Sequence, residues 1–227
     1  MVIRADKAFE KFSLGRAGFT ALPLTVSEKC ERGVTYTCYK KLRKAVCALE
    51  KECSDPFSAD SLLIFRSVTD PFMKKYGYSF DGADTILEYE TSAPLPKGKA
   101  GTAILKTNVE IGRYPADTTL WNLEVDDGDD ADVICAVIEN GRIVSYASVN
   151  DIADEGGYEI TVECAPSARR RGYASSCSAD LASYLISSCK AGAVYYKCRE
   201  ENEGSRKTAE RAGFTYTGKS RSFVYVR

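Results

Sequence analysis

Short apolar runs separated by turn residues dominate the second half of the chain. The alternation predicts strands over Asp132–Glu139 and Arg142–Val149, and Asn140-Gly141 between them is a strong signal for a two-residue hairpin turn. A third strand is predicted over Tyr158–Cys164, with Pro166 ending it. These residues therefore predict a hairpin followed by a third strand.

Apolar positions recur at helical spacing after this strand. The predicted elements are helices over Gly172–Lys190 and Gly204–Ala212 and strands over Gly192–Cys198, Phe214–Gly218 and Phe223–Val226. Together with the first three strands they give the order ββ-β-α-β-α-β-β. This order predicts an α/β fold built on a mixed sheet.

The first half of the chain gives weaker signals. Helical spacing predicts a helix over Thr35–Cys53, and Asp70-Pro71 predicts the start of a short helix that Gly77 ends. The run Leu62–Val68 fits either a strand or part of a helix, because periodicity cannot separate short apolar runs. Strands are also predicted over Thr85–Glu90 and Thr102–Leu105, with a loop rich in proline and glycine between them.

Composition excludes several kinds of chemistry. The 227 residues are 44% apolar and 28% charged, which is ordinary for one large or two small globular domains. A net charge of -1 argues against a nucleic-acid partner. The chain has no histidine, which excludes Ser-His and Cys-His nucleophile pairs and histidine-ligated metals. The nine cysteines lack CxxC spacing, so we expect no metal site and reduced, buried thiols.

The chain also carries signals about its location. Met1–Leu14 is charged throughout and lacks the apolar core of a secretory signal. The longest apolar run, Val133–Ile138, is far shorter than the roughly 20 residues that a membrane helix needs. We therefore expect a cytoplasmic protein without a membrane partner.

An acidic segment lies ahead of the predicted hairpin. It carries six carboxylates, at Glu124, Asp126, Asp127, Asp129, Asp130 and Asp132. The spacing is not that of a calcium-binding loop. The segment is interpreted as a solvated loop, with an acidic lip that attracts a cationic substrate as the alternative.

The hexamer Arg169-Arg170-Arg171-Gly172-Tyr173-Ala174 lies between a predicted strand and a predicted helix. A helix start offers unpaired N–H groups and a partial positive charge. Gly172 lets the backbone approach a bulky anion, and the three arginines add charge. This combination suits a pyrophosphate. The alternative is a basic helix start that only solubilises the surface.

A second motif follows across the next strand and helix: Asn202, Ser205, Ala209 and Gly213-Phe214. With the R-x-x-G-x-A of the hexamer, it resembles the GNAT superfamily of acyl-CoA-dependent N-acyltransferases over about residues 131–227. The resemblance implies a mostly antiparallel sheet flanked by helices, with acetyl-CoA as co-substrate. We therefore divide the chain into an N-terminal α/β region, 1–110, for packing or the substrate side, and an acetyl-CoA-binding acetyltransferase domain, 111–227.

The resemblance also implies which residues hold acetyl-CoA. The backbone of Val162, Glu163 and Cys164 would pair with pantetheine, and the N–H groups from Arg169 to Ala174 would hold the pyrophosphate. The Asn202 side chain would bond the pantetheine arm, with Ser205 beside it. Capping of the following helix is a second role for Asn202.

Acetyl transfer to an amine needs a base, and the leaving thiolate needs a proton. Glu159, early on the third strand, is the first candidate base, and Glu163 is the second; a plain solvent-facing glutamate is the alternative. Many family members carry a tyrosine seven residues after the asparagine, where this chain has Ala209. Tyr216 is the candidate replacement, with Tyr225, Cys198 or a water as alternatives.

These residues favour an N-acetyltransferase acting on a primary amine of a small molecule or peptide. One alternative is a non-catalytic acyl-CoA-binding or regulatory module. Another is nucleic-acid binding through Arg169–Arg171, Lys197, Arg199 and Lys207, which the balanced net charge disfavours. A homodimer is left open.

Overall fold

The computed structural model of the protein describes residues 2–4, 20–30, 33–120, 123, 133–153 and 157–226. These residues form two compact units, one up to Leu87 and again from Thr217, and the other over Glu88–Tyr216. The domain boundary expected from the sequence, between residues 110 and 111, lies inside the second unit. Two long strands, β5 (Ser79–Thr91) and β11 (Thr215–Val226), contribute residues to both units.

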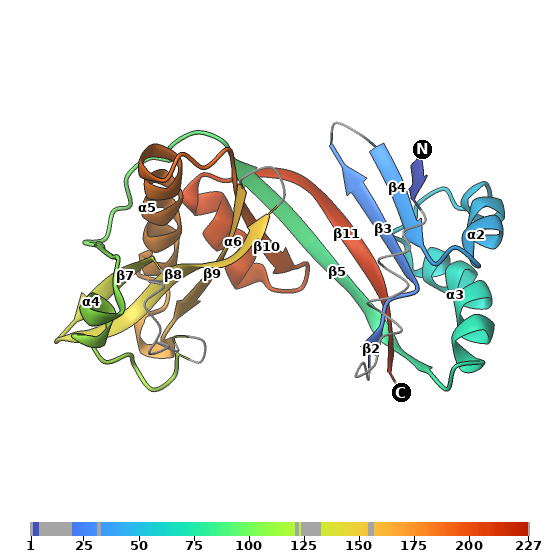
Figure 1. Ribbon diagram of the computed structural model, residues 1–227, viewed down its shortest axis with the longest axis horizontal. Coiled ribbons are helices and arrows are strands. Elements are labelled where there is room, and N and C mark those ends of the chain that lie inside the picture. Colours follow the sequence, from blue (N-terminus) through green and yellow to red (C-terminus); the bar gives the residue numbers. More distant parts are fainter. Residues whose placement is uncertain are drawn as a thin grey trace. The chain divides into compact units, whose positions relative to one another are not determined.

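The first unit combines a sheet with two helices (Figure 1). Besides parts of β5 and β11, its elements are β1 (Val2–Arg4), β2 (Thr20–Ala21), β3 (Leu24–Lys29), β4 (Gly33–Cys38), α2 (Arg43–Glu50) and α3 (Ala59–Lys74). Its strands lie in the order β1-β4-β3-β11-β5, and β2 pairs with the end of β11. Phe65, Phe223 and Tyr225 lie in its hydrophobic core.

The helix predicted over Thr35–Cys53 is correct only in its second half. Residues 35–38 belong to β4, whose register against β3 places Tyr36 opposite Val26. Tyr36 and Cys38 are both buried. The alternation of a strand therefore governs these residues, and the helical spacing begins to apply only at α2.

The helix start predicted at Asp70-Pro71 is wrong. Helix α3 begins earlier, where the Ser58 Oγ accepts a hydrogen bond from the Ser61 N–H at 3.1 Å, and it continues through Pro71 to Lys74. Phe65, Thr69 and Met73 form its fully buried stripe. Burial of this stripe outweighs the backbone hydrogen bond that proline cannot make.

The two terminal strands predicted on either side of Gly218 are one strand, β11. Gly218 has φ +153 and pairs with Lys29 of β3. A Cβ at this position would lie 2.0 Å from the Glu28 carbonyl oxygen. The glycine therefore permits a close backbone approach and does not end the strand.

The second unit holds most of the elements predicted from the second half of the sequence. Besides parts of β5 and β11, its elements are β6 (Ala103–Leu105), α4 (Asn108–Gly112), β7 (Ile134–Glu139), β8 (Arg142–Ala153), β9 (Gly157–Cys164), the 3-10 turn η2 (Pro166–Ala168), α5 (Tyr173–Ser188), β10 (Val194–Arg199) and α6 (Glu203–Ala212). The strand order is β10-β9-β8-β7-β6. Only β9 and β10 run parallel in this series. The expected mixed, mostly antiparallel sheet flanked by helices is confirmed.

Both faces of α5 are used. Its apolar positions, including Cys177, Leu181 and Leu185, are buried, and the helix packs on β7, β8 and β9. Its polar face holds the preceding loop: the Asp180 carboxylate accepts from the Gly98 N–H at 2.8 Å, and the Ser183 Oγ accepts from the Leu95 N–H at 2.9 Å. The loop predicted between β5 and β6 is thus fixed along the helix that begins at the basic turn.

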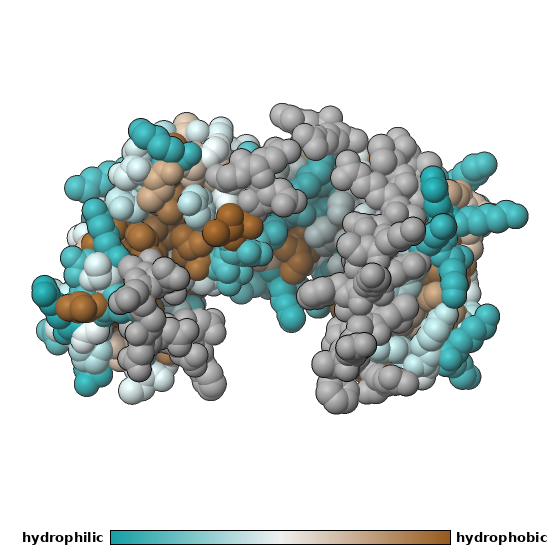
Figure 2. Space-filling model, viewed as in Figure 1, coloured by the Kyte–Doolittle hydropathy of each residue, from teal (hydrophilic) through white to brown (hydrophobic). Residues whose placement is uncertain are grey.

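Figure 2 shows apolar residues gathered on one face of the second unit, with hydrophilic side chains around them.

Within the described ranges, no helix has both the length and the apolar character needed to cross a bilayer.

Candidate active site

Strands β9 and β10 separate after a short paired stretch. They pair in parallel from Tyr158 with Val194 to Ile160 with Tyr196. Both strands then continue, to Cys164 and Arg199, without further pairing to each other. The backbone of β9 beyond Ile160 therefore has an open edge on the side of β10.

The direction of the backbone groups decides what this edge offers. The Tyr158 N–H donates to the Ala193 carbonyl on the β10 side, at 3.1 Å. Because alternate residues of a strand direct their N–H and C=O groups to the same side, those of Val162 and Cys164 also face β10. Arg169 Nε lies 3.4 Å from the Cys164 carbonyl oxygen. Two of the three residues expected to pair with pantetheine thus direct their backbone to the open edge.

Glu163 differs from its two neighbours. Its backbone carbonyl accepts a hydrogen bond from the Ser145 Oγ of β8, at 2.8 Å, on the opposite side of β9. Its side chain lines the groove described next. Glu163 therefore contributes a side chain to the groove, while its carbonyl is held by β8.

A groove of about 280 Å³ lies where the two strands separate. It is lined by residues 159–163 of β9, residues 196–198 of β10, Asn150 of β8, and Asn202 and Ser205 at the start of α6. The structure therefore brings Glu159, Val162, Glu163, Asn202 and Ser205 together, although they are spread over 47 positions of the sequence.

Glu159 forms an ion pair inside the groove. Its carboxylate accepts a hydrogen bond from Lys197 Nζ, and the two side chains are 21% and 44% exposed. Glu159 is thus neither a free solvent-facing carboxylate nor a buried one. It is positioned against an ammonium group inside the groove.

Tyr196 is a groove residue that sequence reasoning missed. Its hydroxyl lies 2.8 Å from the Ser205 Oγ, and the residue is 1% exposed. Burial raises the pKa of its phenol to about 12, so the hydroxyl keeps its proton at neutral pH. The alternation of buried Val194, Tyr196 and Cys198 along β10 was the available signal that this tyrosine points inward.

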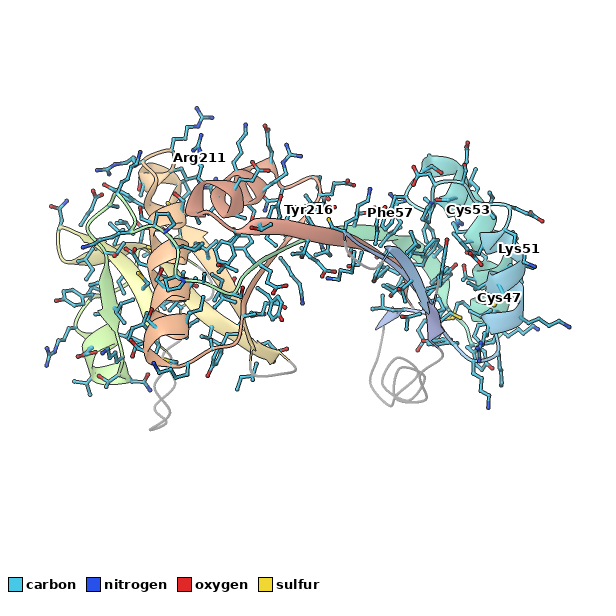
Figure 3. The ribbon with its side chains drawn as sticks, turned by 90° about the horizontal axis from the view of Figure 1, so that it is seen from above. Cys47, Lys51, Cys53, Phe57, Arg211 and Tyr216 are labelled. Carbon is cyan, nitrogen blue, oxygen red and sulfur yellow. The ribbon has the colours of Figure 1, made fainter. Side chains whose placement is uncertain are left out.

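The other candidate proton donors differ in position. Tyr216 lies at the start of β11 (Figure 3), is 41% exposed, and packs its ring against Tyr89 at 5.6 Å. Tyr225 belongs to the core of the first unit, where its hydroxyl lies 2.6 Å from the Thr69 Oγ1. Neither tyrosine lines the groove, whereas Cys198 does. Ala209 is buried and offers no donor.

The basic turn before α5 presents a run of unpartnered N–H groups. The Arg169 N–H lies 3.4 Å from the Pro166 carbonyl, and the Ser176 N–H donates to the Gly172 carbonyl at 3.0 Å. From Arg170 to Ser175, no N–H group has an acceptor within the described part of the chain. Six successive free donors at a helix start are suited to bind a phosphate group.

Backbone conformation at this turn is unusual. Arg170 and Gly172 have φ of +63 and +79, and Gly172 is the N-cap of α5. A Cβ at Gly172 would meet only the Ser175 Oγ, at 4.0 Å. The space in front of the helix is therefore open to a ligand and is not filled by the protein itself.

The three arginines of the turn have different surroundings. Arg171 pairs with Glu139 of β7 at 2.6 Å, and the Tyr173 hydroxyl donates to the same carboxylate at 2.6 Å. These two donors, Tyr173 first, hold the pKa of Glu139 below its usual value. Arg170 has no partner in the described residues. Arg171 therefore fixes the turn to the sheet, whereas Arg170 is free to contact an anion.

Asn202 caps α6. Its side-chain oxygen accepts a hydrogen bond from the Ser205 N–H at 3.0 Å. Its amide NH₂ group has no partner among the described residues and belongs to a side chain that lines the groove. The expected capping role is confirmed, and the amide donor stays available for a ligand.

Replacement of Asn202 by alanine is expected to have two separable effects. Loss of the cap should lower the free energy of unfolding by about 1 kcal/mol. Loss of the amide donor should weaken binding of acetyl-CoA more than binding of 3′,5′-ADP, which lacks the pantetheine arm. Thermal unfolding and calorimetry measure the two effects. The matched variant Asn202→Asp keeps a capping oxygen without the donor, so equal weakening of both ligands there would leave Asn202 with a capping role only.

Two sequence expectations concern other parts of the site. The acidic segment, residues 124–132, lies outside the described residues. Among the residues that the structure does describe, no group of three cysteine, aspartate or glutamate side chains is arranged to hold a metal ion.

Comparison with solved structures gives likenesses at low identity. A Drosophila protein matches with a TM-score of 0.50 and 13% identity, over 72% of this chain and 57% of that one. A putative GNAT-family acetyltransferase from Novosphingobium aromaticivorans matches at 0.48 and 14%, over 66% and 68%. A GNAT-family acetyltransferase from Colwellia psychrerythraea matches at 0.44 and 12%, over 83% and 76%. At such identities the likeness concerns the fold alone. A comparison with curated proteins found no match.

A family model described as an acetyltransferase (GNAT) domain matches residues 63–215, which is more than half of the chain. This range includes the separating strands, the basic turn and the capped helix α6. It begins inside α3 of the first unit and ends at the first residue of β11. The chain therefore belongs to the acetyltransferase (GNAT) family.

Proposed function

We propose that the protein is an acetyl-CoA-dependent N-acetyltransferase that acetylates a primary amine of a small molecule or peptide by direct attack. The proposal rests on one observation: an open backbone edge, a carboxylate and a phenol lie together where β9 and β10 separate. The run of free N–H groups at the start of α5 lies on the segment that continues from the same strand.

The residues present fit acetyl-CoA. The N–H groups from Arg170 to Ser175 and the Arg170 guanidinium would hold the pyrophosphate, since charge-assisted hydrogen bonds to phosphate are the strong ones. The open edge at Val162 and Cys164, with the Asn202 amide, would hold the pantetheine arm. The bound thioester supplies an activated acyl group and a thiolate leaving group.

Two side chains of the groove match the proton transfers that amine acylation needs. Glu159 would take the proton from the acceptor ammonium, which displaces Lys197 from the carboxylate. Tyr196 would give its proton to the thiolate as it leaves, and the Ser205 hydroxyl orients the phenol. Because Tyr196 comes from β10, it could replace the tyrosine that α6 lacks at Ala209.

The test is thiol release from acetyl-CoA in the presence of a panel of primary amines and peptides, with calorimetry of CoA binding in parallel. We expect micromolar to millimolar KM values for at least one amine class, as is usual for enzymes. Binding of CoA without turnover of any amine would favour the non-catalytic acyl-CoA-binding module. Absence of CoA binding would overturn the proposal.

Tyr196→Phe should lower kcat by about 10²-fold or more, the usual contribution of a positioned acid, with little change in KM for acetyl-CoA. The variant keeps the ring that packs on Phe214 at 5.6 Å, so the fold should persist. Steady-state kinetics on the intact protein measure the effect. Tyr216→Phe is the matched control, because it removes the same hydroxyl outside the groove. Equal kcat in both variants would exclude Tyr196 as the proton donor.

A further inference from the structure

Lys197 lies in the groove but has no role in the proposed transfer reaction. It follows Tyr196, the last residue of β10 that pairs with β9. Since Tyr195 is in register with Glu159 and alternate residues share a face, Lys197 lies on the face of Glu159. Its side chain lines the groove at the point where the strands separate. A primary amine of the chain itself is thus held where the proposed acceptor amine must come.

The surroundings of this amine contain the base that acylation would require. The Glu159 carboxylate contacts Lys197 Nζ directly, and Glu163 is the other carboxylate that lines the groove. The Tyr196 phenol lines the same groove from the opposite face of β10. At 44% side-chain exposure, Lys197 is neither buried nor fully solvated. The groove therefore places an amine, a proton acceptor and a proton donor within one volume of about 280 Å³.

We infer that Lys197 is a site of self-acylation by the acyl-CoA thioester. The inference rests on the proposed function, because acyl-CoA binding delivers the donor. Glu159 takes one proton from the Lys197 ammonium, and the neutral Nζ attacks the thioester carbonyl carbon. The N–C bond forms and the C–S bond breaks, with the electron pair leaving on sulfur. The second Nζ proton is lost as the amide forms: one proton ends on the thiol and one in solvent.

The modification would change the groove in a defined way. The amide of acylated Lys197 carries no charge, so Glu159 loses its ammonium partner and the protein loses one positive charge. A covalent change at one residue can therefore be separated from turnover of an external amine by intact mass and by peptide mapping.

The chain contains a matched control for this lysine. Lys207 Nζ lies 2.5 Å from the Glu203 carboxylate on α6, and its side chain is 52% exposed. The two lysines have the same carboxylate partner chemistry and similar exposure, although Glu203 is more exposed than Glu159. Neither Lys207 nor Glu203 lines the groove. A difference in reactivity between the two lysines would therefore reflect the position of Lys197 in the groove and not the presence of a neighbouring glutamate.

The experiment uses the full chain with isotopically labelled acetyl-CoA and no acceptor amine, followed by peptide mapping over time. We expect Lys197 to be acetylated at least tenfold faster than Lys207. The small thioester S-acetyl-N-acetylcysteamine lacks the pyrophosphate and should abolish this preference. In Glu159→Gln the Lys197 rate should fall toward that of Lys207. Lys197→Arg, which keeps the cation, should remove the label at position 197 and leave the labelling of Lys207 unchanged.

A second measurement does not depend on acetyl transfer. CoA without an acyl group should protect Lys197, and not Lys207, from a general amine-reactive label. Calorimetry in the same samples reports CoA binding. If CoA fails to bind, both the proposed function and this inference fall. If CoA binds but the two lysines are acetylated and protected equally, only the self-acylation of Lys197 is overturned.

Discussion

Gly172→Glu should lower the affinity for CoA, measured by calorimetry, at least tenfold. The added side chain would stand in the open space before α5, where only the Ser175 Oγ comes within 4.0 Å of a Cβ. Its charge would repel the pyrophosphate and obstruct the free N–H groups that follow. Each charge-assisted hydrogen bond lost is worth about 1.5–3 kcal/mol.

The substitution also strains the backbone, and that effect needs its own control. Gly172 has φ +79, where a residue with a Cβ costs about 1–2 kcal/mol. Gly141→Glu carries the same charge at φ +74 in the hairpin turn, with nothing within 4 Å of its Cβ. The two variants should therefore lose similar stability in thermal unfolding. If both bind CoA as the original protein does, the turn before α5 is not the pyrophosphate site.

The local part of the site could be predicted from the sequence. The turn at Gly172, the cap at Asn202 and the hairpin at Asn140-Gly141 depend on a few consecutive residues, and local chemistry determines them. The hairpin residues have φ of +49 and +74, as such a turn requires. The position of Glu159 early on β9 follows in the same way from strand alternation.

The remaining part depends on contacts between distant segments. Tyr196 and Lys197 enter the groove because β10 is in register with β9, and a register between strands 36 positions apart cannot be read from either strand alone. Gly218 is read locally as the end of a strand, but Glu28 of a distant strand keeps it within β11. Pro71 likewise does not begin a helix, because the buried stripe of α3 continues past it.

Tyr216, the candidate proton donor, lies outside the groove for the same reason. With 14 tyrosines in the chain, the sequence pattern alone does not show which phenol lies at the groove. The phenol at the groove comes instead from a strand whose inward positions are occupied by Val194, Tyr196 and Cys198. Its neighbour Lys197, on the other face of β10, supplies the ammonium group that contacts the Glu159 carboxylate.

Glu159→Gln is expected to lower kcat by about 10²–10⁴-fold, the usual contribution of a positioned base, while the dissociation constant of acetyl-CoA stays level. Glutamine keeps the shape of the side chain but cannot take a proton from the acceptor amine. Steady-state assays of thiol release measure kcat, and calorimetry measures the dissociation constant.

The contact with Lys197 makes a control necessary, because Glu159→Gln also removes an ion pair. Glu203→Gln removes the equivalent pair with Lys207 on α6, outside the groove, and should leave kcat unchanged. Lys197→Gln removes the ion pair but leaves the carboxylate, so kcat should fall far less in that variant than in Glu159→Gln. If instead Glu159→Gln retains normal kcat, the base is another group of the groove, and Glu163 is the carboxylate that remains there.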